Sequence, residues 1–113
     1  MSQTVLRSDV AAILREWAAG LLSGEQVYNW ANMRFAVDAW DSEDGAVNEV
    51  LAQLDTMDMN LVISEDIPML LRALETTTSE AAAHVIESYT AAIDFAARRD
   101  QLKGEPLYSR FCQ

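Results

Sequence analysis

The sequence predicts an all-α fold: a single-domain bundle of about five helices with a long C-terminal helix. Half of the 113 residues are hydrophobic, which is enough material for one packed core. Only four Gly and two Pro interrupt a chain that is rich in helix-forming residues. Apolar residues recur at spacings of three and four, as on one face of a helix. We therefore expect residues 1–113 to form one helical domain.

The first two helices are expected at about residues 9–22 and 24–37. Ser8 precedes the first helix as a possible N-cap. Its apolar stripe consists of Val10, Ile13, Leu14, Trp17 and Leu21. Before the second helix, Ser23 and Gln26 form a capping box, in which each side chain satisfies a free backbone amide.

A third helix is expected at about residues 43–57, after an acidic loop that ends in a cap at Asp41 or Ser42. Its inward face is continuous and apolar. That face consists of Val47, Val50, Leu51, Leu54 and Met57. The β-prone run 61–63 that follows has no second strand to pair with, so we expect a buried connector.

The fourth helix is expected at about residues 66–75, with Ser64 or Asp66 as its cap and Pro68 in its first turn. The fifth is expected to be long, at about residues 79–103. Its inward positions are Ala82, Ile86, Tyr89, Ile93 and Ala96. Thr77 and Glu80 offer a capping box at its start, and a tail, 104–113, follows it.

Charge is the most distinctive property of the sequence. The net charge is −10, and residues 35–95 hold thirteen acids against Arg72 alone. This excess argues against nucleic-acid binding and favours a basic protein partner. The predicted partner-binding residues are Asp38, Trp40, Asp41, Glu43, Asp44, Glu49, Asp55, Asp58, Glu65 and Asp66. Within this set Trp40 is a candidate anchor, with a buried loop plug as the alternative.

Catalytic chemistry has little to build on. The one histidine, His84, lies four residues after Glu80 and three before Glu87, but a helical metal site needs further ligands from a second helix. We therefore predict no enzyme activity, no metal and no cofactor. The lone Cys112 cannot form an internal disulfide, and no stretch is apolar enough to span a membrane. A soluble, cytoplasmic protein without a membrane partner is expected.

A pattern of Trp17, Gly20, Leu22 and Ser23 opens this acidic helical sequence. It resembles bacterial toxin-immunity proteins of the colicin D immunity type, and the similarity in helices and charge covers about residues 10–74. The resemblance implies a protein that occupies the basic active-site cleft of a toxin, often a nuclease, with carboxylates in place of phosphates. The alternative is a helical homodimer or adaptor with an apolar interface on the last helix, so both a monomer and a homodimer stay open.

Overall fold

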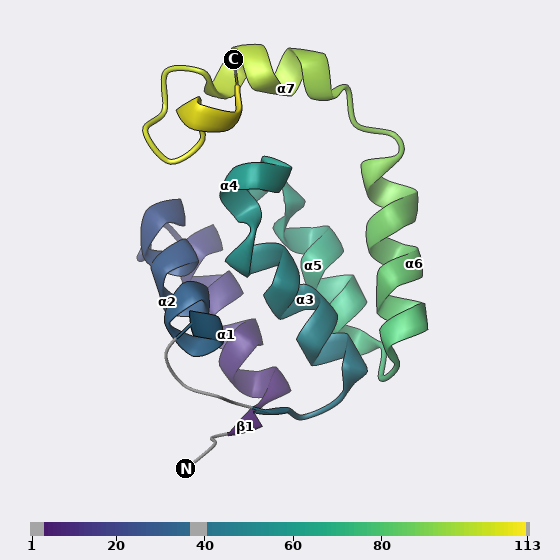
Figure 1. Cartoon of the computed structure of the whole chain (residues 1–113). Helices are drawn as coiled ribbons and strands as arrows, with labels where there is room; N and C mark the ends of the chain where they lie inside the picture. The colour runs from purple at the N-terminus through teal and green to yellow at the C-terminus, as the bar shows by residue number, and fades with distance from the viewer. Residues whose placement is uncertain (1–3, 37–40, 113) are drawn as a thin grey trace.

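The computed structural model describes residues 4–36 and 41–112, in which helices dominate (Figure 1). The helices are α1 (Arg7–Ala18), α2 (Gly24–Ala36), α3 (Gly45–Asp55), α4 (Met57–Asn60), α5 (Ile67–Glu75), α6 (Ser79–Thr90) and α7 (Phe95–Leu102). Two short 3-10 helices, η1 (Ser64–Asp66) and η2 (Ser109–Phe111), accompany them. The mainly helical class is confirmed, with more and shorter helices than expected. No described helix is long and apolar enough to cross a bilayer.

A small parallel sheet is the feature that the sequence did not predict. Strand β1 (Thr4–Val5) pairs with β2 (Asp41–Ser42). Because Asp41 and Ser42 are extended in this pair, neither caps the third helix. The cap of α3 is Asp44, whose side chain accepts a hydrogen bond from the amide of Val47.

The helix starts are otherwise close to expectation. Ser23 and Gln26 form the predicted capping box in both directions. At α1 the prediction of a Ser8 cap is wrong, because the helix already begins at Arg7 and the amide of Leu6 bonds to Asp9. At α6 the cap is Thr78, one residue after the predicted Thr77.

The core lies between α1, α2, α3 and α5, with α6 packed against α3 and α5. The predicted face of the third helix is confirmed, because its five apolar residues are fully buried. The connector 61–63 is buried as expected. The prediction that Leu21 belongs to the buried stripe of the first helix is wrong, because its side chain is 74% exposed. Helix α1 ends at Ala18, and Gly20 then turns the chain with a φ of 79°.

The prediction of a long C-terminal helix is wrong. The expected segment 79–103 divides into α6 and α7, which meet at a turn around Asp94 (Figure 1). The amides of Ala92 and Ile93 bond three residues back, which tightens the end of α6, and the Asp94 side chain then caps α7. Helix α7 consequently crosses one end of the bundle, and Ala96, predicted to be inward, is exposed.

Candidate binding surface

The predicted partner-binding acids do not form one group. Arg7 binds both the residues before α3 and the carbonyls at the end of α5, so α3 begins where α5 ends. The acids before or early in α3 therefore lie at one end of the bundle, and those from Asp55 to Asp66 lie at the other. Along α3, Asp44 and Asp55 are eleven residues apart, roughly 16 Å, whereas Glu49 and Asp55 are six apart, roughly 9 Å. Asp38 and Trp40 lie outside the described residues.

Asp66 is an internal residue, with a side chain that is only 2% exposed. Arg98 donates to both of its carboxylate oxygens, at 2.8 and 3.2 Å. The Tyr89 hydroxyl donates to Oδ1 at 2.7 Å, and the Ile63 amide donates to Oδ2 at 3.0 Å. The hydrogen bond to this carboxylate raises the pKa of Tyr89, and burial raises it further. Asp66 thus holds α7 on the bundle, and its carboxylate is not available to a partner.

Asp58 is the second buried acid. Its Oδ2 accepts from the Tyr28 hydroxyl at 3.1 Å and lies 3.4 Å from Nη2 of Arg110. Its Oδ1 accepts from the Met59 amide. Burial, together with the neighbouring Asp58, raises the pKa of Tyr28, although a hydrogen bond from Asn32 opposes this shift. Asp58, in α4, therefore links Tyr28 of α2 to Arg110 of the C-terminal segment, residues 95–112.

Two further acids at this end are not enclosed in the same way. Glu65 is exposed in η1, just before α5, and Asp55 is half-buried in α3. Burial, and then the charge of Asp58, raise the pKa of Asp55. Because four basic residues of the C-terminal segment, Arg98, Arg99, Lys103 and Arg110, also lie at this end, its carboxylates are partly compensated.

At the other end Arg7 organises the acids. Its Nη1 donates to Glu43 Oε2 at 3.0 Å and to Asp44 Oδ2 at 2.9 Å. Its Nε and Nη2 donate to the carbonyl oxygens of Leu74 and Thr76, each at 2.8 Å. Arg7 therefore satisfies the free carbonyls at the end of α5 and compensates one nearby carboxylate charge.

Six carboxylates lie before or early in α3, at the end of α5 or at the start of α6, and we call this set the acidic end; Arg72, in the last turn of α5, is a basic residue beside it. The six carboxylates are those of Asp41, Glu43, Asp44, Glu49, Glu75 and Glu80. Glu49 accepts a short hydrogen bond from the Ser79 hydroxyl, which fixes it beside α6. The start of α3 can lie this close to the start of α6 because residue 45 is a glycine. A Cβ at this position would lie only 2.7 Å from the backbone nitrogen of Ser79.

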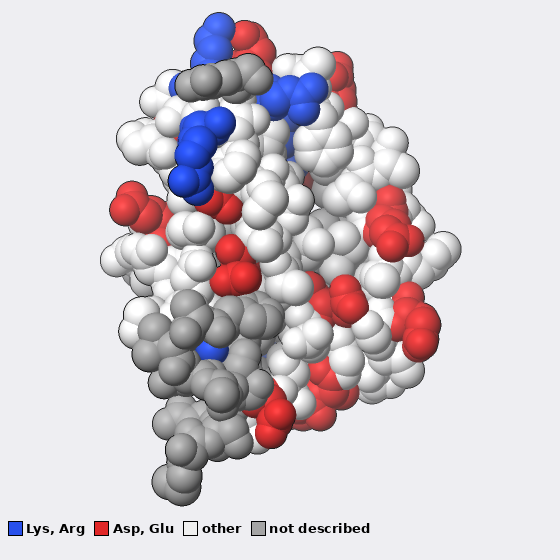
Figure 2. All heavy atoms as spheres, in the orientation of Figure 1, with Lys and Arg blue, Asp and Glu red and all other residues white. Residues whose placement is uncertain are grey.

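Glu75 and Glu80 were missing from the predicted set. Both are exposed and flank the turn between α5 and α6. A turn this short makes consecutive helices antiparallel neighbours, so it was the signal that could have placed them together. Figure 2 shows most of the visible Lys and Arg side chains toward the top, one further basic side chain at the lower left, and only carboxylates at the lower right.

Other chemistry is sparse in the part of the chain that the structure describes. His84 is exposed on α6, and Cys112 is half-buried. Across residues 4–36 and 41–112, no three His, Cys, Asp or Glu side chains are placed to share a metal ion. Nothing in this geometry therefore adds a candidate active site to the acidic end.

Comparison of the chain with the models of protein families, with curated proteins and with solved structures finds no match. The resemblance to toxin-immunity proteins of the colicin D type consequently stays a prediction. The fold and the surface together define a mostly helical protein with an electrically asymmetric surface.

Proposed function

We propose that this chain is a non-catalytic binding protein that docks a basic protein partner on its acidic end. The observation that carries the proposal is that six carboxylates share one end of the bundle, where Arg7 is ion-paired to two of them and Arg72, in the last turn of α5, is a second basic residue. Like charges held close together repel one another. Binding of a basic partner reduces this repulsion and therefore lowers the free energy of the surface.

The opposite end supports the proposal by contrast. There Arg98 is bonded to Asp66, Arg110 to Asp58 and Lys103 to Asp100. Three carboxylates at that end are therefore paired within the molecule. At the acidic end Arg7 is the only ion-paired basic residue among the described ones, and the basic residues Arg98, Arg99, Lys103 and Arg110 lie at the opposite end; this difference would orient a basic partner as it approaches.

In its finer form the proposal is a toxin-immunity function. The partner would then be a toxin with a basic active-site cleft, and the carboxylates of the acidic end would occupy the positions of nucleic-acid phosphates. The support for this form is the resemblance carried by Trp17, Gly20, Leu22 and Ser23 together with the acidic charge.

The test is affinity capture from the native cell at low and high salt, followed by association kinetics with the purified partner. In the test variant Asp41→Lys, Glu75→Lys and Glu80→Lys are combined, because these exposed side chains have no ion pair within the described residues. We expect the association rate to fall at least about tenfold at low salt. The wild-type rate should also fall as salt is raised.

The matched control combines Glu16→Lys, Glu65→Lys and Glu87→Lys, which are exposed residues outside the acidic end. It changes the net charge equally, and each set includes one acid near a helix start, Glu80 or Glu65. We expect the control to slow association much less. Equal effects of the two variants, or a rate indifferent to salt, would contradict docking at the acidic end.

The homodimer alternative has less support. An apolar interface on the last helices requires exposed large hydrophobic side chains there. In the described chain such side chains are Leu6, Leu21, Met33 and Met59, and none belongs to α6 or α7. Sedimentation of the purified protein alone tests this alternative, because a homodimer forms without a second component.

A further inference from the structure

The C-terminal segment, residues 95–112, contributes little to the core. Leu102 and Tyr108 are its only buried residues, whereas α3 alone contributes five. Helix α7 crosses one end of the bundle, and no other described helix packs closely along it (Figure 1). Because buried apolar surface provides most of the stability of a fold, the segment is held less firmly than the helices of the bundle, α1 to α6, hold one another.

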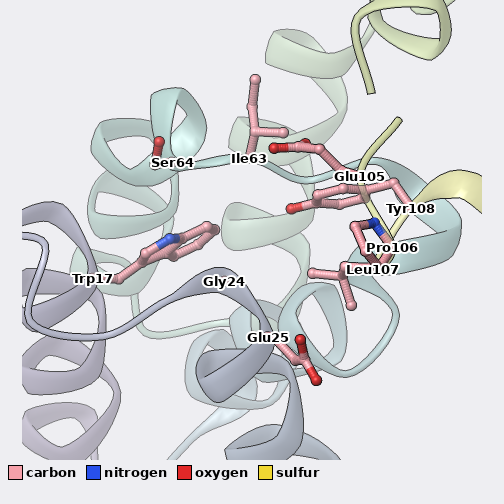
Figure 3. A pocket seen from close by; sticks show the side chains of 9 residues that line it. All are labelled: Trp17, Gly24, Glu25, Ile63, Ser64, Glu105, Pro106, Leu107 and Tyr108. Carbon is pink, nitrogen blue, oxygen red and sulfur yellow. The ribbon is translucent and has the colours of Figure 1, made fainter. Parts of the chain in front are cut away.

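Three hollows lie along the boundary between the C-terminal segment and the bundle. In the first, of about 280 Å³, Trp17 of α1 lies on one side and Pro106 and Leu107 lie on the other (Figure 3). The second, of about 360 Å³, lies between the connector, α5, α6 and α7, and the third, of about 260 Å³, lies between α2 and the residues around Arg110. A well-packed interior has few gaps larger than a water molecule, so this boundary is packed more loosely than the core.

Polar contacts hold the C-terminal segment in place, and their acceptors all lie within residues 58–66. In the part of the chain that the structure describes, no other side-chain hydrogen bond joins the segment to the bundle, apart from the Asp94 cap at its start. The contacts run from Arg98 to the Leu61 carbonyl and Asp66, from Tyr108 to the Val62 carbonyl and from Arg110 to Asp58. Because the acceptors share one short stretch, a single movement of the segment breaks all of these bonds together. Water replaces the lost partners, so the net cost of breaking the bonds is modest.

We infer that the C-terminal segment opens and closes as one unit, about the turn at residues 91–94, while the bundle stays folded. The turn suits a hinge because it lies between the end of α6 and the start of α7. In the open state the apolar floor of the second hollow, which includes Leu61, Val62 and Met69, loses the cover of Phe95. Opening therefore exposes apolar surface that the closed form hides, and the segment acts as a strap over the connector. The inference does not depend on the proposed function.

The test is native-state hydrogen exchange of the ¹⁵N-labelled full chain, followed by NMR at neutral pH in a series of low urea concentrations. We expect the amides of Leu102 and Tyr108 to share one opening equilibrium, with protection at least about a hundredfold lower than in α3. Urea should speed their exchange because opening exposes surface, but less steeply than it speeds exchange in α3. The amides of α3 should exchange only through global unfolding.

Two variants separate opening of the segment from unfolding of the bundle. Tyr108→Phe removes one bond to the connector, and because the segment opens as one unit, the exchange of Leu102 in α7 should become at least about fivefold faster. The matched control is Val47→Ala, which removes buried methyl groups in the first turn of α3, at the opposite end of the bundle. It should speed exchange in α3 at least about fivefold and leave that of Leu102 unchanged.

Either of two results would overturn the inference. Equal protection of Leu102 and α3, with equal acceleration of both by Val47→Ala, would show that the segment opens only when the whole chain unfolds. Exchange of Leu102 that responds neither to urea nor to Tyr108→Phe would show fraying of α7 alone. The urea series on the wild type separates these outcomes even where a variant folds poorly. Neither result affects docking at the acidic end, because no partner takes part in the measurement.

Discussion

Asp66 and Asp44 differ in how completely the fold takes each carboxylate out of solvent. Both are aspartates beside a helix start, and each is paired with an arginine. The Asp66 side chain is 2% exposed and that of Arg98 is 11% exposed, whereas the corresponding values for Asp44 and Arg7 are 23% and 26%. A buried charge must keep its partners, but a half-exposed one can exchange them for water. The comparison therefore separates acids that hold the fold together from acids that a partner can reach.

The largest expected effect is that of Asp66→Ala. This change leaves the Arg98 guanidinium without its counter-ion and removes the acceptor of Tyr89 and of the Ile63 amide. We expect the free energy of unfolding to fall by about 3–5 kcal/mol. Urea denaturation followed by circular dichroism measures the change.

A double variant provides the control. Combining Asp66→Leu with Arg98→Met removes both charges together, and an apolar pair often replaces a buried ion pair at little cost. We expect the double variant to be more stable than Asp66→Ala. A loss below about 1 kcal/mol for Asp66→Ala would show that this carboxylate is no more important than an exposed one.

A smaller effect is expected for Tyr108→Phe. The Tyr108 hydroxyl donates to the buried carbonyl of Val62 and ties the C-terminal segment to the connector. Loss of this bond should reduce the free energy of unfolding by about 1–3 kcal/mol, because a buried acceptor loses its donor. The measurement is urea denaturation at neutral pH.

Alkaline pH tests the same residue independently. Burial raises the pKa of Tyr108 well above its ordinary value, and the pKa of Tyr89 is also raised. A pKa raised on folding contributes stability that is fully present below the unfolded value of about 10 and is lost as the pH rises above it. The wild type should therefore lose stability above about pH 10 more steeply than Tyr108→Phe. Parallel pH profiles would contradict the raised pKa.

Asp44→Ala tests the half-exposed carboxylate of the comparison. The change removes the cap of α3 and an ion pair that is partly exposed, so we expect a loss of about 1 kcal/mol by thermal or urea denaturation. Asp44→Ser keeps a capping oxygen but not the charge and should recover most of this loss. If the serine variant were as unstable as the alanine variant, the ion pair with Arg7 would stabilise the fold more than the cap does.

The sequence predicted local features well and the pairing of distant charges poorly. The capping box at Ser23 and the buried face of α3 depend on residues that are near one another in the chain, and both were confirmed. Asp66 was assigned to the partner surface because its arginine is 32 residues away and lies on a helix that was predicted to be continuous with α6. The cap at Asp94, which ends that continuity, was the local signal that was missed.

The smallest expected effect is that of Asp55→Asn, and its sign is opposite to the others. Burial and the charge of Asp58 raise the pKa of Asp55, so the folded state binds a proton more readily than the unfolded state does. Its contribution to stability is then fully present below the ordinary aspartate pKa and is lost as the pH rises through the folded value. At neutral pH the charged side chain is unfavourable, and Asp55→Asn should raise the free energy of unfolding by up to about 0.5 kcal/mol. Denaturation at pH 7 and below about pH 4 checks this, because the gain should vanish where Asp55 is protonated in both states. A loss of stability at pH 7 would mean that Asp55 has a favourable partner, and it would then belong with Asp58 and Asp66 among the acids that hold the fold together.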